Sequence, residues 1–437
     1  MKVAIVCDWL TNVGGAEKVL LEVHRLYPNA PIYTSKYSPR KIDWFRDADV
    51  RTGWLQIFPT WMRRLLIPLR QRWFSRLDLS EYDLIISITG AEAKAVKSGR
   101  RLYAEGKNAK NPKGIHISYC HVPTQYYWQM YDSYVENPGF GVFNPVVRFF
   151  FKLMVRPLRR RDYEAAQAPD YYVTISEYAK GLIGEYYDRE AIVIHPPVEV
   201  KDFKAGDAHT FSRAASPRPV DPSGRPLGVA STRNASVSSA RLLKRPATGE
   251  ACSSSPCQAP EALRKGIERH PPYIITSRQV NWKRIDLAVK ACMEMKRKLL
   301  VVGEGPEHNK LVKLSNGSKW VEFVPLQEKR ELAELLAGAR GFLFPSMEPF
   351  GIAPVEALAA GCPVVAFGEG GARDYVIDGK NGVLFNKQTV KAMEEAIKRF
   401  EKMKFDPLKV AKTAESFSVK RFDQGMRRYV KKTLKQQ

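Results

Sequence analysis

The sequence predicts an α/β protein made of two units, each with a parallel sheet covered by helices on both faces. Three observations lead to this fold class. Short apolar runs typical of buried strands alternate with helical patterns along the chain. This alternation occurs twice, on either side of a segment with a different composition. The chain has 437 residues and is 44% apolar, which suits two domains with sizeable cores.

We expect the first unit to span residues 1–200. It begins with the strand-like run KVAIVCDW, and a helix follows with its apolar residues on one face. Later strands are expected in YDLIISIT, GIHISYCHVP and AIVIHPPVE, with a strand and a helix in YYVTISEYAKGLIGEYY. Such an order brings the carboxyl ends of parallel strands to one edge, where ligands bind in this architecture.

The second unit is expected over residues 271–415. Strands are predicted in YIITSR, KLLVVGEGP, GFLFPS and PVVAF, with helices in RIDLAVKACMEM and KRELAELLAGA. Two such units side by side create a cleft between their strand ends. Residues 416–437 are predicted to form a helix that packs back on the first unit.

Residues 205–270 differ from both flanks. Half of these 66 residues are Ala, Ser, Pro or Gly, and nine are Ile, Leu, Val, Met or aromatic. Such a segment buries too little apolar surface to offset the entropy of ordering it. We therefore predict a disordered insertion that takes no part in catalysis.

The remaining global features restrict the class of protein without choosing one. The net charge of +24 favours polyanionic partners, namely nucleic acid, anionic lipid or phosphorylated ligands. The six cysteines lack metal-ligand spacing, which favours reduced and mostly buried thiols. No apolar run reaches the roughly 18 residues of a membrane span. Because the N-terminus also lacks the pattern of a signal peptide, we expect a cytoplasmic protein.

The first motif is Gly14-Gly15 in DWLTNVGGAEKV, between a strand and a helix. Glycines there let backbone N–H groups approach an anion, and a helix N-terminus favours negative charge. On its own this pair is weak evidence, because an ordinary strand-to-helix turn looks the same.

The second motif places Arg278 and Lys283 just after a strand of the second unit. Arg offers a planar fork to phosphate oxygens and Lys a compact charge, so the pair suits a diphosphate. A solvated basic loop is the competing interpretation, and the position at a strand end favours function.

The third motif is MEPFGIAPVE, with Glu348 in a turn and Glu356 about one turn into the following helix. The amides that start this helix, around Phe350, Gly351 and Ile352, face the predicted cleft. Each carboxylate is placed to accept hydrogen bonds from vicinal hydroxyls of a sugar or a ribose. The alternative for Glu356 is a favourable interaction with the dipole of its own helix.

The fourth motif is ISYCHVPTQYYW, where His121 follows an apolar strand. A histidine at a strand end can donate to a ligand hydroxyl or take part in proton transfer. His116 lies within the same strand and is expected to be structural.

Together these motifs, with GEGP and Gly370-Gly371, resemble the family 4 glycosyltransferases, which are retaining enzymes of the GT-B fold. The resemblance covers the chain outside residues 205–270, and E-x7-E with AGCPVVAFGEGGARDYVIDGKNGVLF is its most specific part. The string YCHVPTQYYW is similar to bacterial mannosyltransferases of polysaccharide assembly. Asp374 departs from the family pattern, in which many members have Glu after the Gly-Gly pair.

The resemblance implies a nucleotide-sugar bound by the second unit and an acceptor bound by the first. Arg278 and Lys283 would hold the diphosphate beside the Gly14-Gly15 loop. Glu356 would bind the ribose and Glu348 the donor sugar, next to the amides of residues 350–352. His121 would contact the transferred sugar. GDP-mannose is the implied donor, a UDP-sugar is possible, and neither a metal nor another cofactor is expected.

The acceptor and the location rest on two segments of the first unit. Both segments combine apolar, aromatic and basic residues: FNPVVRFFFKLMVRPLRRRDYEAA and WLQIFPTWMRRLLIPLRQRWF. In the first, Arg148, Lys152, Arg156 and Arg159 recur at helical spacing. Both suit the surface of an anionic membrane, although a helix packed on the core with a solvated basic face would read similarly. We therefore predict a glycan or lipid-linked acceptor for cell-surface polysaccharide and peripheral contact with the inner membrane face.

Two other classes of function stay open. A GT-B sugar-nucleotide epimerase, or an inactive nucleotide-sugar-binding protein, would keep the cleft and change the chemistry. A nucleic-acid-binding protein would fit the charge. It leaves E-x7-E unexplained, because carboxylates repel a phosphate backbone.

Overall fold

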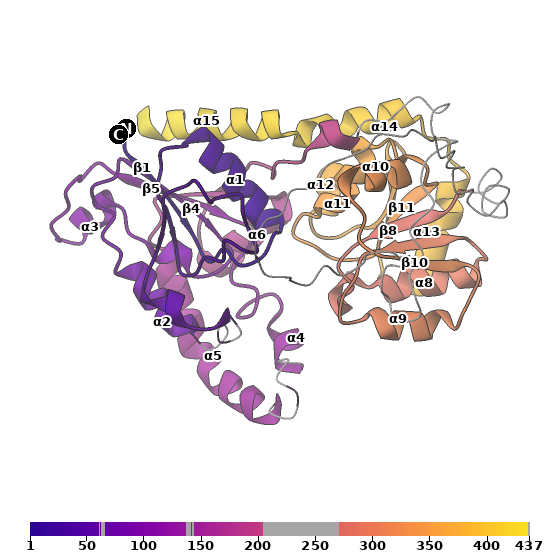
Figure 1. The fold of residues 1–437 in the computed structure, drawn as a ribbon, viewed down its shortest axis with the longest axis horizontal. Coiled ribbons are helices and arrows are strands. Elements are labelled where there is room, and N and C mark those ends of the chain that lie inside the picture. Colours follow the sequence, from indigo (N-terminus) through magenta and orange to yellow (C-terminus); the bar gives the residue numbers. More distant parts are fainter. Residues whose placement is uncertain (61, 63–65, 137–140, 142–143, 204–270, 436–437) are drawn as a thin grey trace, which may run out of the picture.

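The computed structural model describes residues 1–435 apart from 61, 63–65, 137–140, 142–143 and 204–270. It contains two α/β domains that lie side by side, each built on a parallel sheet (Figure 1). The fold class predicted from the sequence is thereby confirmed. The predicted disordered insertion, residues 205–270, lies outside the described residues.

The N-terminal domain contains a seven-stranded sheet in the order β3-β2-β1-β4-β5-β6-β7. Its strands are β1 (Val3–Cys7), β2 (Ile32–Thr34), β3 (Val50–Thr52), β4 (Leu84–Thr89), β5 (Ile115–Cys120), β6 (Tyr171–Thr174) and β7 (Ala191–Val193). Its helices are α1 (Gly15–Leu26), α2 (Ile67–Ser75), α3 (Gly99–Ala104), α4 (Tyr131–Glu136), α5 (Asn144–Ala166) and α6 (Glu177–Tyr187). Every residue of β1, β4 and β5 is buried, because helices cover both faces of a parallel sheet.

The C-terminal domain contains a six-stranded sheet in the order β10-β9-β8-β11-β12-β13. Its strands are β8 (Tyr273–Thr276), β9 (Leu299–Val302), β10 (Val321–Val324), β11 (Gly341–Phe344), β12 (Val364–Phe367) and β13 (Gly382–Phe385). Its helices are α8 (Ile285–Glu294), α9 (His308–Ser315), α10 (Lys329–Ala337), α11 (Ile352–Ala359), α12 (Ala372–Tyr375), α13 (Val390–Glu401) and α14 (Pro407–Ala414).

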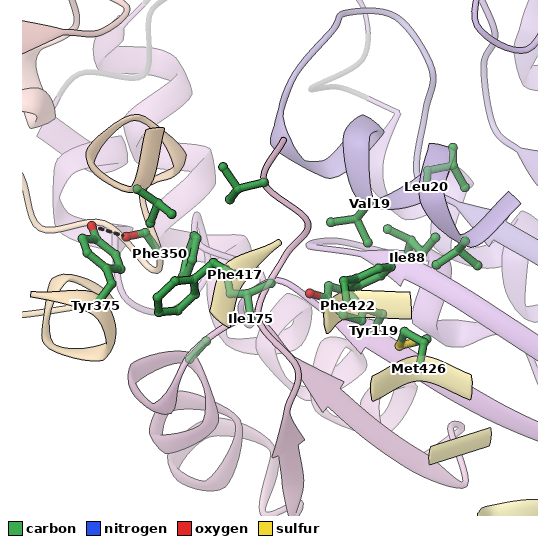
Figure 2. Packing of buried hydrophobic residues seen from close by; sticks show 14 of the residues in the cluster. Val19, Leu20, Ile88, Tyr119, Ile175, Phe350, Tyr375, Phe417, Phe422 and Met426 are labelled. Carbon is green, nitrogen blue, oxygen red and sulfur yellow. Dashed lines mark hydrogen bonds between the residues drawn. The ribbon is translucent and has the colours of Figure 1, made fainter. Parts of the chain in front are cut away.

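The last helix, α15 (Val419–Lys435), leaves the C-terminal domain and runs along the N-terminal one, so that both chain ends lie close together (Figure 1). Its buried face is apolar and includes Phe422 and Met426, which pack near Tyr119 of β5 (Figure 2). On the other side of the same cluster, Phe417 lies against Phe350 with ring centroids 5.8 Å apart. One hydrophobic cluster therefore joins the two domains.

The sheet topology defines where ligands can bind. In each domain the strand order reverses around a central pair, β1 and β4 in the first and β8 and β11 in the second. Ligands in open α/β sheets bind at the carboxyl ends of strands beside such a reversal. The loops after these four strands contain Asp8, Gly90, Arg278 and Glu348, and all four residues line one cavity.

Two predicted features have simple structural outcomes. His116 is fully buried in β5, with its ring nitrogens 2.9 Å from the Val96 carbonyl oxygen and 2.7 Å from Ser87 Oγ, and it is a structural residue. Within the described part of the chain, four cysteines are free and buried: Cys7, Cys120, Cys292 and Cys362. None of the helices formed by described residues combines the length and apolarity required to cross a bilayer.

Candidate functional site

A cavity of about 1050 Å³ lies between the two domains and collects most of the residues singled out in the sequence. Eight of the ten candidate residues line it: Gly15, His121, Arg278, Lys283, Glu348, Phe350, Gly351 and Ile352. Gly14 and Glu356 are not among its lining residues. Its walls come from both domains, so a ligand that fills it contacts both.

Glu348 lies in the turn after β11 and is held there by two donors. Ser346 Oγ donates to its Oε1 over 2.8 Å, and Lys283 Nζ lies 2.5 Å from the same oxygen. Both charged side chains are mostly covered, with 21% of Lys283 and 17% of Glu348 exposed. In this structure the lysine and the glutamate neutralise each other at the cavity wall.

The loop that carries Glu348 is fixed by the Gly370-Gly371 turn. A Cβ on Gly370 would lie 2.4 Å from the Glu348 carbonyl oxygen, and one on Gly371 would lie 2.4 Å from Phe350 Cα. The Gly371 N–H donates to that same carbonyl oxygen over 2.8 Å. Tyr375 Oη donates to the Phe350 carbonyl over 2.8 Å (Figure 2). Only glycine therefore lets the two loops approach this closely.

Arg278 follows β8 and is exposed on the cavity wall. The GEGP turn supports its loop, since a Cβ on Gly303 would lie 2.4 Å from the Ser277 carbonyl oxygen. Gln279 Nε2 also donates to the Gly303 carbonyl over 2.6 Å. The arginine thus projects from a backbone that two loops hold together.

Two helix N-termini face each other across the domain boundary. Helix α1 begins at Gly15 after Gly14, and α11 begins at Ile352 after Gly351, which has φ +93°. A Cβ on Gly15 would lie 3.0 Å from Ile352 Cδ1, so the two helix starts are nearly in contact. The free N–H groups and dipoles of both helices favour an anion between them.

Glu356 was predicted to accept hydrogen bonds from the hydroxyls of a ligand. In this structure it is paired with a lysine of the other domain. Its Oε1 lies 3.4 Å from Lys18 Nζ, and 13% of the glutamate side chain is exposed. Lys18 belongs to the first turn of α1, so this ion pair links the two domains. The ammonium group therefore lies beside one oxygen of this carboxylate.

His121 reaches the cavity from the end of β5. Its Nε2 is buried and has no hydrogen-bond partner among the described residues. Burial lowers the pKa of His121 to about 4, so the imidazole is neutral near pH 7. A neutral ring with a free nitrogen at a cavity wall can donate to or accept from a hydroxyl group of a ligand.

Asp8 is a site residue that the sequence analysis did not assign. It follows β1, and its buried carboxylate accepts from Thr89 Oγ1 and from the backbone N–H groups of Gly90, Ala91 and Ala93 at 2.8–3.1 Å. Burial raises the pKa of this carboxyl. Its position directly after a buried strand was the available signal, and its role is to shape the loop after β4.

A second unassigned group lies beside Asp8 on the cavity wall. Arg70 forms a two-point ion pair with Glu92, with Nε and Nη2 each 3.1 Å from a carboxylate oxygen. Tyr126 Oη donates to Glu92 over 2.6 Å, and the guanidinium lies 5.0 Å from the Trp9 ring centroid. No local pattern could reveal this group, because its members come from four separate segments.

Asp374, which departs from the family pattern, joins the two domains. Its Oδ2 accepts from the Glu177 N–H over 2.9 Å at the N-terminus of α6 and lies 3.6 Å from His195 Nδ1. Burial raises the pKa of this carboxyl. Ser176 Oγ also donates to the Pro349 carbonyl, next to Glu348. These contacts position the loop that carries Glu348 relative to the N-terminal domain.

The cavity extends to helices α4 and α5, which project from the N-terminal domain (Figure 1). The basic stripe predicted on α5 is only partly available for other partners. Arg148 donates to the carbonyls of Val135 and Glu136, and Arg159 donates to the Tyr127 carbonyl over 2.6 Å. Two of the four basic residues predicted at helical spacing, Arg148 and Arg159, therefore fix α4 and the preceding loop to α5.

The base of α5 is anchored by a buried carboxylate. Asp162 lies 2.7 Å from Lys94 Nζ and accepts from Thr124, Trp128 and Tyr187, each over 2.8 Å. A buried charge with this many partners defines one position for the helix. Among the described residues, no group of histidine, cysteine, aspartate and glutamate side chains could hold a metal ion.

Known proteins resemble this chain in two ways. A family model described as Glycosyl transferases group 1 matches residues 262–417, a range that covers most of the C-terminal domain. The solved structure of Anabaena HepE in complex with UDP superposes with a TM-score of 0.61 at 16% identity, covering 99% of this chain and 100% of that one. At this identity the likeness establishes the fold alone.

Two curated relatives are mannosyltransferases. Human alpha-1,3/1,6-mannosyltransferase ALG2 is 31% identical over 162 residues, which are 35% of this chain and 38% of that protein. The GDP-mannose-dependent alpha-(1-6)-phosphatidylinositol monomannoside mannosyltransferase of Mycolicibacterium smegmatis is 31% identical over 150 residues, 31% of this chain and 39% of that protein. The chain spans about a fifth to two fifths of the length of the curated relatives that it matches.

Proposed function

We propose that this chain, which has the GT-B fold and whose residues 262–417 match the model of the glycosyl transferases group 1, is a retaining glycosyltransferase. It moves a sugar, mannose in the first instance, from a nucleotide-sugar to a glycan or lipid-linked acceptor of cell-surface polysaccharide. One observation carries this proposal. A single cavity between the domains brings Arg278, Lys283 and Glu348 of one domain together with His121 of the other.

In this proposal the donor diphosphate binds where positive charge converges. Arg278, Lys283 and the N-termini of α1 and α11 surround one end of the cavity. Breaking the bond between sugar and phosphate develops negative charge on the leaving diphosphate, and fixed positive groups lower the energy of that step. Lys283 leaves Glu348 to meet the phosphates, and the freed carboxylate accepts hydroxyls of the donor sugar.

The remaining groups position the reacting sugar. The unpartnered His121 Nε2 contacts a hydroxyl of the transferred sugar, and Glu356 exchanges Lys18 for the ribose hydroxyls. Attack from the face that the leaving group vacates, through an oxocarbenium-like state, retains the anomeric configuration. No side chain is assigned as a covalent nucleophile, and no metal is assigned a role.

Donor and acceptor follow from different observations. Two relatives with modest identity are mannosyltransferases, and one of them is GDP-mannose-dependent, which makes GDP-mannose the first donor to test. The complex of Anabaena HepE with UDP makes a UDP-sugar the second. The acceptor binds the N-terminal domain, whose helix α5 contributes six residues to the cavity lining.

We further propose peripheral contact with an anionic membrane through the outer face of α5. Phe149 and Leu153 are 66% and 63% exposed and do not line the cavity. Lys152 and Arg156 lie beside them and are exposed, which combines apolar anchors with charges that attract anionic lipid. This contact holds the enzyme at the cytoplasmic face of the membrane.

The test is nucleotide release from a panel of GDP- and UDP-sugars, with and without a membrane extract as the source of acceptor. A transferase releases one class of nucleotide faster when acceptor is present, and Lys283→Met abolishes this release. An epimerase would convert the nucleotide-sugar without releasing nucleotide. Binding of a nucleotide-sugar with neither reaction would identify a binding protein and overturn the proposal.

A further inference from the structure

The wall that α5 gives to the cavity contains only apolar side chains among the described residues. Six residues of this helix line the cavity: Val146, Val147, Phe150, Phe151, Met154 and Leu158. They recur at helical spacing and form one stripe about 18 Å long, at 1.5 Å per residue. None of the basic residues of α5 belongs to this stripe.

The stripe is distinct from the proposed membrane-facing side of the same helix. Phe149 and Leu153 are exposed and do not line the cavity, whereas their neighbours Phe150 and Met154 line it. Even so, Phe150 is 56% exposed and Met154 is 42% exposed. Large apolar side chains that stay uncovered along a cavity wall mark a ligand-binding surface.

Residues outside α5 add both apolar and polar lining. Ile67 and Pro68, at the start of α2, line the cavity together with the rings of Tyr126 and Tyr134, and Arg70 of the same helix lines it while paired with Glu92. Along the α5 stripe itself, a free glycan would lose its water and find no hydrogen-bonding side chain, which disfavours it there. A hydrocarbon chain needs no such partners and gains from burial.

The cavity lining thus combines two kinds of chemistry. His121, Lys283 and Glu348 supply polar and charged groups, and the α5 stripe supplies apolar surface. A ligand that contacts both is an amphiphile, with a sugar at the polar groups and a hydrocarbon chain along α5.

We infer that the α5 stripe is the subsite for the hydrocarbon chain of the acceptor. This inference rests on the transferase function proposed above, and it narrows the acceptor from a glycan or a lipid-linked glycan to a lipid-linked one. The chain lies inside the cavity, so it is a binding interaction separate from the contact between the outer face of α5 and the membrane.

The probes are butyl, octyl and dodecyl phosphate, each titrated calorimetrically into the full-length protein below its critical micelle concentration and without vesicles. Affinity rises with chain length, by up to about fourfold for each methylene that is fully buried. The double variant Phe150→Gln, Met154→Gln loses most of this dependence and binds dodecyl phosphate at least about tenfold more weakly. Glutamine keeps the helix propensity of the segment high.

The matched control is the double variant Phe149→Gln, Leu153→Gln, which alters the outer face of the same two turns. It keeps the chain-length dependence of the wild type. Equal dependence in all three proteins, or its loss in the control variant alone, would overturn the inference.

A parallel titration with GDP-mannose and UDP-glucose separates this inference from the proposed function. Normal binding of a nucleotide-sugar without chain-length dependence would leave the transferase in place and remove the lipid subsite. Chain-length dependence without binding of any nucleotide-sugar would keep the lipid subsite and remove the transferase function.

Discussion

Where the C-terminal domain lines the cavity, the groups that face it are charged and held by short hydrogen bonds. Glu348 has two hydrogen-bond donors. Its loop packs so closely against Gly370 and Gly371 that neither position has room for a side chain. Where α5 lines the cavity, the wall is apolar and partly exposed. The first turns of this helix project from the N-terminal domain. We interpret this contrast as a proposed donor end, formed by Arg278, Lys283 and Glu348, that recognises a charged group, and a proposed surface on α5 that adapts to a hydrocarbon chain.

This difference has a physical basis. A diphosphate is recognised through directional charge-assisted hydrogen bonds, whose strength depends on fixed geometry. A hydrocarbon chain is recognised through area removed from water, which is not directional. We therefore expect substitutions at the donor end to have larger effects than substitutions on α5.

The largest effect is expected for Lys283→Met, which removes a cation from the proposed diphosphate site. By analogy with the loss of one group that stabilises transition-state charge, kcat/KM should fall by about 10²–10³. Steady-state nucleotide release measures this fall. Arg284→Met is the matched control, because Arg284 is paired with Asp286 over 3.2 Å and does not line the cavity. A similar loss in both variants would mean that the effect is structural.

The second prediction concerns His121 and the pH dependence of stability. Its pKa falls from 6.5 in the unfolded chain to about 4 in the folded protein because of burial. Between these values the unfolded chain binds more protons, so the free energy of unfolding decreases as the pH is lowered from 6.5 towards 4. The share due to His121 is about 3 kcal/mol.

The measurement is urea unfolding of the wild type and of His121→Asn near pH 7 and near pH 4. His116 titrates in both proteins, so its share cancels in the comparison. The variant should lose about 3 kcal/mol less than the wild type on acidification. Parallel pH profiles for the two proteins would show that His121 keeps an ordinary pKa.

The residues proposed for the donor end could be singled out from the sequence because they lie in continuous motifs. Glu348, Gly351 and Glu356 belong to one strand–turn–helix segment, and the helix predicted there begins at Ile352. The buried strands were predictable for the same reason, since β4 and β5 are continuous apolar runs. The fold class follows from these local patterns.

Contacts between distant segments could not be predicted. The pair of Lys18 and Glu356 joins residues 338 positions apart, and the group of Arg70, Glu92 and Tyr126 assembles from separate loops. The apolar and basic pattern of α5 was visible, but its division into two faces requires the cavity. The sequence also could not show that Arg148 is bound to backbone carbonyls.

The third prediction tests the outer face of α5. Lys152→Gln with Arg156→Gln should weaken binding to vesicles that contain phosphatidylserine by about 1 kcal/mol for each lost charge. Vesicle flotation at two salt concentrations measures this change, and nucleotide-sugar binding should stay as in the wild type. The control removes two exposed charges of α13, Lys391→Gln with Lys398→Gln, and should leave flotation intact. Equal loss of vesicle binding in both double variants would show that net charge, and not the outer face of α5, is responsible for the binding.

The smallest effect is expected for Lys18→Met, at the boundary between the two ends. In this structure Lys18 Nζ lies 3.4 Å from Glu356 Oε1, and both side chains are partly covered. If ribose hydroxyls must displace this ammonium group, its removal makes donor binding tighter. A partly exposed ion pair contributes at most about 1 kcal/mol, so the gain in affinity should be less than about fivefold.

Calorimetric titration of the donor into Lys18→Met and into Lys18→Arg measures this gain. Arginine keeps the charge and should keep the wild-type affinity, whereas methionine keeps the length of the side chain and loses the competition. Tighter binding with methionine would show that the interdomain ion pair competes with the donor for Glu356. Weaker binding would show instead that Lys18 moves to the phosphates with the donor, which would make it a third cation of the donor end and extend that end across the domain boundary into α1.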